Sequence, residues 1–204
     1  MLSSSGSVAG GFAVARGFSL IEFMVTIALA ALLLGLASPS FVTWTRNSQV
    51  RTVTDSLQNG LRLAQTEAVR RQRQVVFFLT NNATCDTANT ASANGRFWVI
   101  RTVPLLDGET AQVVQCGVLS DVASGAAITG PTALCFNSAG RLVTNATPGG
   151  GAACTIDASG TNTYDVTRAG ADRSLRVLVS VGGQTRLCDP ARTLSDSQPD
   201  GCPA

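Results

Sequence analysis

The chain contains no histidine and no lysine, so all 15 of its basic residues are arginine. Without histidine there is no ordinary Ser-His-Asp or Cys-His catalytic unit and no imidazole ligand for a metal ion. No Gly-x-Gly-x-x-Gly motif is present, and no lysine follows the glycine runs, which excludes the familiar phosphate-binding loops. We therefore expect neither an enzyme nor a protein that holds a metal or another cofactor.

Net charge and aromatic side chains are also scarce. The 15 basic residues are nearly balanced by 13 acidic ones, and the formal charge of +2 gives no strong field that would steer nucleic acid toward the chain. Aromatic residues make up 5% of the sequence, which leaves few rings on which bases could stack. A length of 204 residues predicts one globular domain with a short extension.

The six cysteines all follow one long apolar segment: Cys85, Cys116, Cys135, Cys154, Cys188 and Cys202. An even number on one side of a membrane indicates disulfides formed in an oxidising compartment, with buried free thiols as the alternative. No Cys-x-x-Cys pair occurs, so a zinc site would need four distant thiolates. Of the possible pairings the sequence favours Cys188 with Cys202, which would close a short polar tail.

The apolar segment, residues 18–38, carries a single charge, Glu22. As a helix with a rise of ~1.5 Å per residue it is about 30 Å long, enough to span a bilayer. Arg16 precedes it with no acid before it, which predicts a cytoplasmic start and a globular domain on the other side. A carboxylate in hydrocarbon normally has a partner or a function, although Glu22 near the interface would also be tolerated if hydrated or protonated. Pro39 predicts a kink near residues 38–40.

Beyond Pro39 the apolar residues recur with the spacing of one helix face: Val50, Val53, Leu57, Leu61, Ala64 and Ala68. This pattern predicts an amphipathic helix over residues 39–73 that covers a sheet. The other side is rich in arginine, and we interpret these residues mainly as a soluble surface. In an assembly they would also meet acids on neighbouring helices.

Residues 74–204 change to short β-branched and aromatic runs separated by turn residues, which predicts a β-rich domain and an α+β protein. We expect strands at 75–80, 97–103, 112–119, 133–136, 141–144, 164–167, 175–181 and 184–188. The polar stretches 81–95 and 145–162 are predicted to be loops held by cysteines. A two-residue turn at Gly182-Gly183 would place Arg176 opposite Asp189.

The stretch from Gly17 to Glu22, GFSLIE, resembles the prepilin signature of type IV pilins and type II secretion pseudopilins. The resemblance implies that a prepilin peptidase removes residues 1–17, cutting between Gly17 and Phe18, and methylates the new amino terminus. The amine of Phe18 would then neutralise Glu22 of another subunit and set the assembly register. It further implies a single-pass inner-membrane protein with a periplasmic domain, whose partners are other pilin subunits and an inner-membrane assembly platform. A plain anchored binding domain would instead keep residues 1–17.

The segments at 62–77, 136–141 and 175–189 resemble minor pilins and pseudopilins of the FimT/GspH type. This resemblance implies a pilin fold and a subunit that primes or caps a type IV pilus or a type II secretion pseudopilus, which share the anchor and the domain. Some FimT-like pilins bind DNA through a carboxy-terminal Gly-Arg-x-Arg motif, for which this sequence has GQTR from Gly183 to Arg186. The missing first arginine counts against DNA binding, and five carboxylates near the chain's end do so too. Candidate DNA contacts are Arg168, Arg173, Arg176, Arg186 and Arg192.

Overall fold

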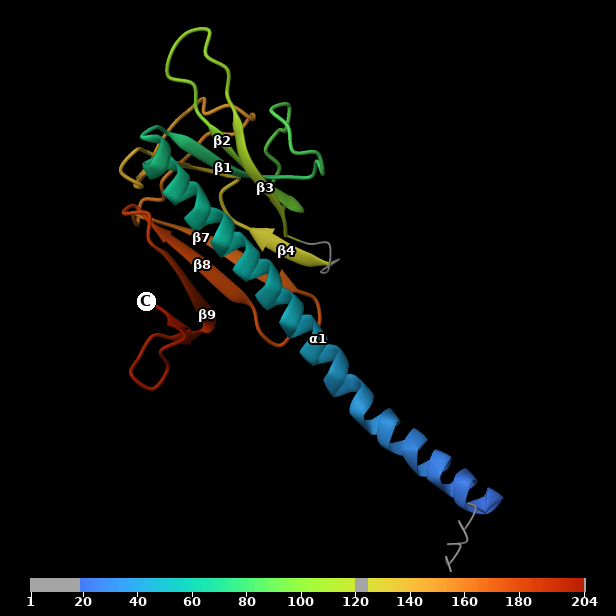
Figure 1. Ribbon diagram of the computed structural model, residues 1–204. Coiled ribbons are helices and arrows are strands. Elements are labelled where there is room, and N and C mark those ends of the chain that lie inside the picture. The colour runs from blue at the N-terminus through green and yellow to red at the C-terminus, as the bar shows by residue number, and fades with distance from the viewer. Residues whose placement is uncertain (1–18, 120–124, 204) are drawn as a thin grey trace, which may run out of the picture. The chain divides into compact units, whose positions relative to one another are not determined.

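A computed structural model describes residues 19–119 and 125–203, except for the side chains of residues 36–39 (Figure 1). The chain divides into two compact units, Met1–Phe41 and Val42–Ala204. Its elements in order are α1 (Leu20–Arg71), β1 (Val75–Thr80), β2 (Phe97–Thr102), β3 (Val113–Val118), β4 (Ala126–Thr129), β5 (Ala133–Phe136), β6 (Leu142–Val143), β7 (Thr161–Arg168), β8 (Leu175–Ser180), β9 (Thr185–Thr193) and β10 (Gly201–Cys202).

The strands of the described residues form two five-stranded sheets, in the orders β3-β2-β1-β5-β6 and β10-β9-β8-β7-β4. Neighbouring strands are antiparallel except for β10, which runs parallel to β9. Figure 1 shows the part of α1 that belongs to the second unit crossing both sheets, with β1 and β2 on one side of it and β7 and β8 on the other. The α+β prediction is confirmed, with the difference that the strands divide into two sheets.

The predicted apolar face of the helix forms the centre of the main core. All six residues of that face have no exposed surface, and they pack with Phe77 and Ile100 of one sheet and with Tyr164 and Val177 of the other. A helix at this place can bury so much because side chains three and four positions apart lie on one stripe. The pattern of residues 50–68 was therefore sufficient to predict which side of α1 faces inward.

The helix ends two residues earlier than the apolar pattern predicts, because a Schellman motif closes it. Gln72 adopts a left-handed conformation with φ of 53°, its N–H donates to the Val69 carbonyl at 3.2 Å, and that of Arg73 donates to the Ala68 carbonyl at 3.2 Å. These bonds satisfy carbonyls that the last turn would otherwise leave unpaired. The chain can then turn directly into β1.

A second core lies on the other face of the first sheet, where Phe78 and Arg101 are buried. The Arg101 guanidinium lies 5.3 Å from the centre of the Phe78 ring, and its Nη1 donates to the Thr87 carbonyl at 2.8 Å. The Ala91 N–H donates to the Gly150 carbonyl at 2.7 Å, which joins the two loops over this core. Burial lowers the pKa of Arg101, because desolvation disfavours the charged guanidinium.

Three disulfides join all six cysteines: Cys85–Cys116, Cys135–Cys154 and Cys188–Cys202. The predicted Cys188–Cys202 pair is confirmed, and the first two disulfides tie the two predicted polar loops to the first sheet. Each closed loop restricts the unfolded chain and so stabilises the fold by up to a few kcal/mol (about 3 kcal/mol for a loop near 15 residues).

The β8–β9 hairpin differs from its predicted register by one residue. Gly183 has φ of 84° and its N–H donates to the Ser180 carbonyl at 2.8 Å, so the loop contains three residues, 181–183, instead of two. Arg176 consequently lies opposite Cys188, and Asp189 lies on the other face. A slip of one residue exchanges the two faces of a strand, so the predicted pair of Arg176 with Asp189 is wrong.

Candidate functional site

Two of the predicted processing residues, Gly17 and Phe18, lie outside the described residues. Glu22 lies in the first turn of α1 with an exposed side chain, and no ion pair of the described residues involves it. Pro39 falls within the bounds of α1, and its side chain is outside the description.

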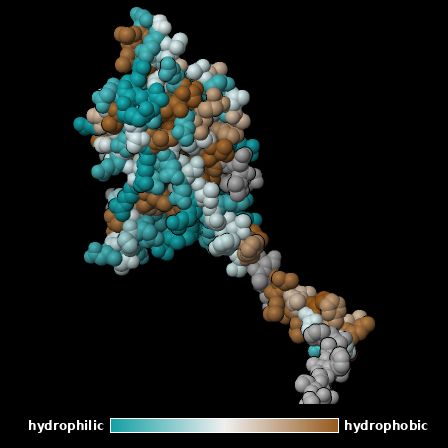
Figure 2. Space-filling view, in the orientation of Figure 1, coloured by the Kyte–Doolittle hydropathy of each residue, from teal (hydrophilic) through white to brown (hydrophobic). Residues whose placement is uncertain are grey.

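The described start of α1 is apolar and exposed all round. Leu20, Phe23, Ile27 and Leu34 each expose more than half of their surface, and Figure 2 shows hydrophobic side chains gathered on this segment. Among the described residues no single helix is apolar and long enough to cross a membrane, whereas Leu20–Gly35 and Ser40–Arg71 taken as a pair pass the test of length and composition.

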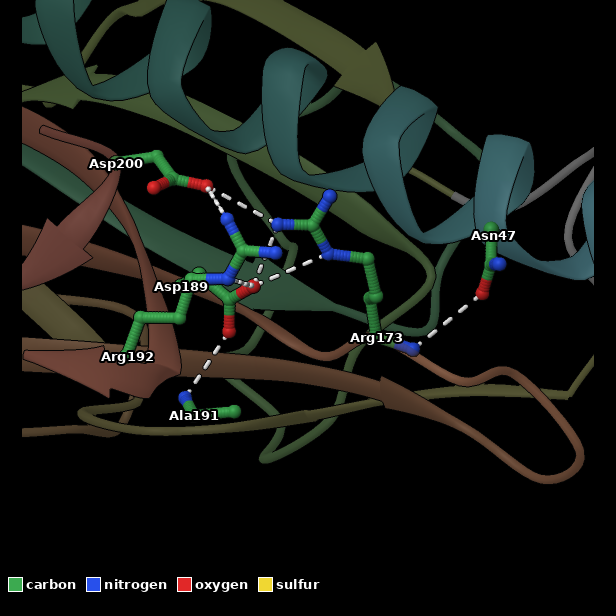
Figure 3. A network of polar contacts seen from close by, with 6 residues as sticks. All are labelled: Asn47, Arg173, Asp189, Ala191, Arg192 and Asp200. Atoms are coloured by element: carbon green, nitrogen blue, oxygen red, sulfur yellow. Dashed lines mark hydrogen bonds and ion pairs between the residues drawn. The ribbon is translucent and has the colours of Figure 1, made fainter. Parts of the chain in front are cut away.

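The carboxy-terminal arginines form a network with aspartates (Figure 3). Arg173 Nη2 lies 2.7 Å from Asp189 Oδ2 and 3.1 Å from Asp200 Oδ2. Arg192 Nη1 reaches the same oxygen of Asp200 at 3.0 Å. Asn47 of α1 ties this network to the helix, because its Oδ1 accepts the N–H of Arg173 at 3.4 Å. Two of the five candidate DNA contacts are thus already paired with carboxylates.

The other three candidates are dispersed. Arg176 pairs with Asp165 on the neighbouring strand β7, with Nε 2.7 Å from Oδ1. Arg186 is exposed and its Nη2 donates to the Pro199 carbonyl at 3.5 Å, a weak contact. Arg168, at the end of β7, has a buried Nη1 with no partner in the described part of the chain. The structure therefore does not bring the five arginines together into one unpaired basic surface.

Asp189 anchors the network. Only 4% of its side chain is exposed, and this burial acts to raise its pKa. The hydrogen bonds from Arg173 and from the Ala191 N–H, at 3.0 Å, act in the other direction and prevail, so the pKa of Asp189 lies below its ordinary value. A carboxylate so held stabilises the folded state in its charged form.

We expect Asp189→Asn to destabilise the domain at neutral pH by about 2 kcal/mol, since charge-assisted bonds to two arginines are weakened. A lowered folded pKa gives stability that is present above the unfolded pKa of about 3.9 and is lost as pH falls through the folded value. The difference between variant and wild type should therefore shrink below about pH 4. Urea unfolding of the purified full chain in detergent measures this. Asp172→Asn is the control variant. A destabilisation by Asp189→Asn that is the same at neutral pH and below about pH 4 would contradict the stabilising role of the charged Asp189 carboxylate.

A groove of about 440 Å³ lies beside this network, between the helix residues from Trp44 to Arg51 and strands β8 and β9. Leu175, Leu187 and Cys188 line it together with Arg173 and Asp189. Within the described residues no group of Cys, Asp or Glu is arranged to hold a metal ion. The groove combines an apolar wall with charged side chains, and its available signal in the sequence was the large apolar Trp44 among Thr43, Thr45 and Arg46.

A second surface that the sequence did not reveal is the tip of the β2–β3 connection. Leu105 and Leu106 expose 65% and 75% of their surface there. The two adjacent leucines before Asp107 and Gly108 were the available signal, because a turn sequence on a surface loop seldom carries large apolar residues.

Comparisons with known proteins place these features in a family. The family model described as "Type II transport protein GspH" matches residues 53–183, and the model of the "Prokaryotic N-terminal methylation motif" matches residues 13–38. No curated protein matches the chain.

Three solved structures are similar in fold to the chain. The type IV minor pilin FimU of Pseudomonas aeruginosa is 18% identical, with a TM-score of 0.49, over 72% of this chain and 96% of that one. The minor pseudopilin EpsH of the Vibrio cholerae Type 2 Secretion System is 16% identical, with a TM-score of 0.44, over 71% and 99%. Escherichia coli GspH is 12% identical, with a TM-score of 0.42, over 73% and 94%. Because the GspH model matches more than half of the residues, the chain belongs to the family of type II transport protein GspH.

Proposed function

We propose that this chain is a minor filament subunit that primes or caps a type IV pilus or a type II secretion pseudopilus, acting by assembly and not by catalysis. The observation that carries the proposal is the order of two features in one chain. A methylation motif at residues 13–38 is followed directly by a GspH domain at 53–183. Processing of the amino terminus prepares the first helix of a subunit for insertion among the first helices of other subunits.

In this proposal the prepilin peptidase removes residues 1–17, and residues 18–38 hold the subunit in the inner membrane before assembly. Residues 39–73 carry the helix, which ends at Arg71, into the globular domain, and residues 74–204 lie in the periplasm. The three disulfides suit that compartment, because disulfides form and persist where the environment is oxidising. During assembly the apolar surfaces of the first helix exchange lipid for neighbouring helices.

Glu22 has a defined role in such a bundle. An ionised carboxylate among apolar helices is unfavourable by at least about 2.5 kcal/mol unless it is paired. The new amine of Phe18 on an adjacent subunit supplies the opposite charge close to the same depth. The pair then favours one axial offset between neighbouring helices over the others.

Mass spectrometry of the protein from cells with an active prepilin peptidase tests the proposal. We expect a mature chain that begins at methylated Phe18, and the unprocessed chain in cells that lack the peptidase. An intact peptide across Gly17 and Phe18 in the first cells would leave a simple membrane-anchored domain as the better description.

DNA uptake is the weaker alternative. Arg173, Arg176 and Arg192 are engaged with aspartates, so phosphates would have to compete with carboxylates that are already in place. Arg186 is the exposed arginine of the motif-like segment, and a single cation contributes little to binding a polyanion. We therefore assign the arginine and aspartate network a structural role.

A further inference from the structure

The tip of the β2–β3 connection, residues 104–108, is an apolar projection with a defined conformation, and we name it the leucine tip. Glu109 holds its two exposed leucines in place. The Oε2 of this carboxylate accepts the Leu105 N–H at 2.9 Å, and the Glu109 N–H donates to the Leu106 carbonyl at 3.1 Å. An ordered loop loses less conformational entropy on binding than a floppy one, so this pair of leucines is suited to burial against a partner.

Glu109 is itself anchored beside the end of α1. Its Oε1 pairs with Arg73, whose Nη2 also donates to the Val103 carbonyl at the base of the tip, at 3.4 Å. The Leu105 N–H and the Arg73 guanidinium hold the pKa of Glu109 below its usual range, so this carboxylate is charged at neutral pH. Arg73 and Glu109 offset each other. Asp107 therefore carries the uncompensated charge of the tip, because it is exposed and takes part in no ion pair within the described part of the chain.

The leucine tip lies at the end of the globular unit that is remote from the point where the chain enters it. This unit begins at Val42, and α1 continues from there to Arg71, a length of about 43 Å at ~1.5 Å per residue. Figure 1 shows the β2–β3 connection projecting beyond this end of the helix, at the top of the view. The tip is thus the part of the unit that an approaching partner on that side meets first.

We propose that the leucine tip docks on a different subunit of the same filament, in an apolar pocket that has a Lys or Arg at its rim. Leu105 and Leu106 supply the apolar area, and Asp107 supplies the charge that a basic rim complements. In the proposed assembly, subunits leave the membrane one after another. The remote end of the unit therefore faces the subunit that left before this one, and that subunit is the partner.

The two other occupants of an apolar projection fit the tip less well. A second copy of this chain would repeat the contact from copy to copy, which a subunit that primes or caps a filament does not do. A lipid surface would draw Asp107 toward hydrocarbon together with the leucines, which is unfavourable for a carboxylate. This inference rests on the proposed function, since it names the kind of partner that the subunit meets within a filament.

The test uses the full chain in cells that assemble the filament. Thr110, which is exposed beside the tip, is replaced by the photoreactive p-benzoylphenylalanine, so that both leucines and Asp107 stay in place. Irradiation should join the chain to one different pilin-type protein, and the linked peptide, sequenced by mass spectrometry, should come from an apolar surface with a Lys or Arg. The same probe at Leu194, exposed just after β9, is the control and should not give that pair.

Substitutions in chains that carry the probe at Thr110 separate the apolar part of the contact from its charge. Leu106→Ser should lower the cross-linked yield about tenfold, because the apolar area of one buried leucine is lost. Asp107→Arg should lower the yield about fivefold, the effect of one exposed ion pair. Leu194→Ser and Asp196→Arg make the same two changes at exposed positions outside the tip, and they should leave the yield unchanged.

The outcomes distinguish this inference from the proposed function. In filaments that contain the subunit, a cross-link from Thr110 to a second copy of this chain, to lipid or to nothing would overturn the docking of the tip and leave the proposed function intact. An unchanged yield in Leu106→Ser or in Asp107→Arg would have the same meaning. Absence of the wild-type subunit from the filament fraction would overturn both.

Discussion

Glu22→Ala leaves the subunit in the membrane and removes it from filaments. Alanine increases the hydrophobicity of residues 18–38, so insertion is not impaired. The variant loses the carboxylate that the Phe18 amine of a neighbour would meet, and that amine is then left unpaired among apolar helices. Since an unpaired charge there costs at least about 2.5 kcal/mol, we expect the amount in the sheared filament fraction to fall more than tenfold. Quantitative immunoblots of the membrane and filament fractions measure both quantities.

One further variant separates the charge of the Glu22 side chain from its shape, and a second, at a neighbouring residue, is the control. Glu22→Gln keeps nearly the same volume without the charge and should behave like Glu22→Ala. Thr26→Ala, one turn further along α1, removes a hydroxyl that donates to the Phe23 carbonyl at 2.9 Å and should assemble normally. Normal incorporation of Glu22→Gln would show that the carboxylate does not set the register.

Gly183→Ala destabilises the globular domain by about 3 kcal/mol or more. Gly183 has φ of 84°, a conformation that costs an L-residue roughly 1–2 kcal/mol. A Cβ at this position would also overlap the carbonyl oxygen of Gly140 and the side-chain amide of Gln65. The Gln65 amide donates to that same carbonyl at 3.0 Å, so the overlap disturbs the place where the hairpin meets α1 and the β5–β6 loop.

The adjacent Gly182 provides a matched control. Its φ is not left-handed, and the nearest atom to an added Cβ would be Ser180 Oγ at an ordinary 3.7 Å. We expect Gly182→Ala to change the free energy of unfolding by less than about 1 kcal/mol. Urea unfolding followed by circular dichroism compares the two variants in the full chain. Equal stability of the two would mean that the hairpin tolerates a different turn.

The parts of the fold that depend on local periodicity were predicted from the sequence. Strands β1 and β5 were predicted with the observed bounds, and the six apolar residues of α1 face the core as expected. In each case the signal is contained in a few neighbouring residues, since helix and strand spacing alone assigns a side chain to a face. The Cys188–Cys202 pair was also predicted, because the short separation of the two residues restricted the choice.

The parts that depend on distant contacts were not predicted. Strands β4 and β10 contain four and two residues, and each is a strand because it pairs with a longer neighbour. Asp189 pairs with Arg173, which lies outside the β8–β9 hairpin. The loop of that hairpin contains Val181 in addition to the two predicted glycines, and this extra residue shifts the register by one. The groove at Trp44 brings together residues that are distant in the sequence, so no local pattern describes it.

The loops that close over Arg101 also have a consequence for the order of events during biogenesis. Cys85–Cys116 and Cys135–Cys154 tether the two loops, and the second core beneath them is complete when both loops are in place. In the assembly that we propose, a chain oxidised before it leaves the bilayer would carry a finished second core. The enzymes that introduce disulfides into exported proteins would in this way act as a checkpoint on which molecules are fit to be drawn into the growing fibre.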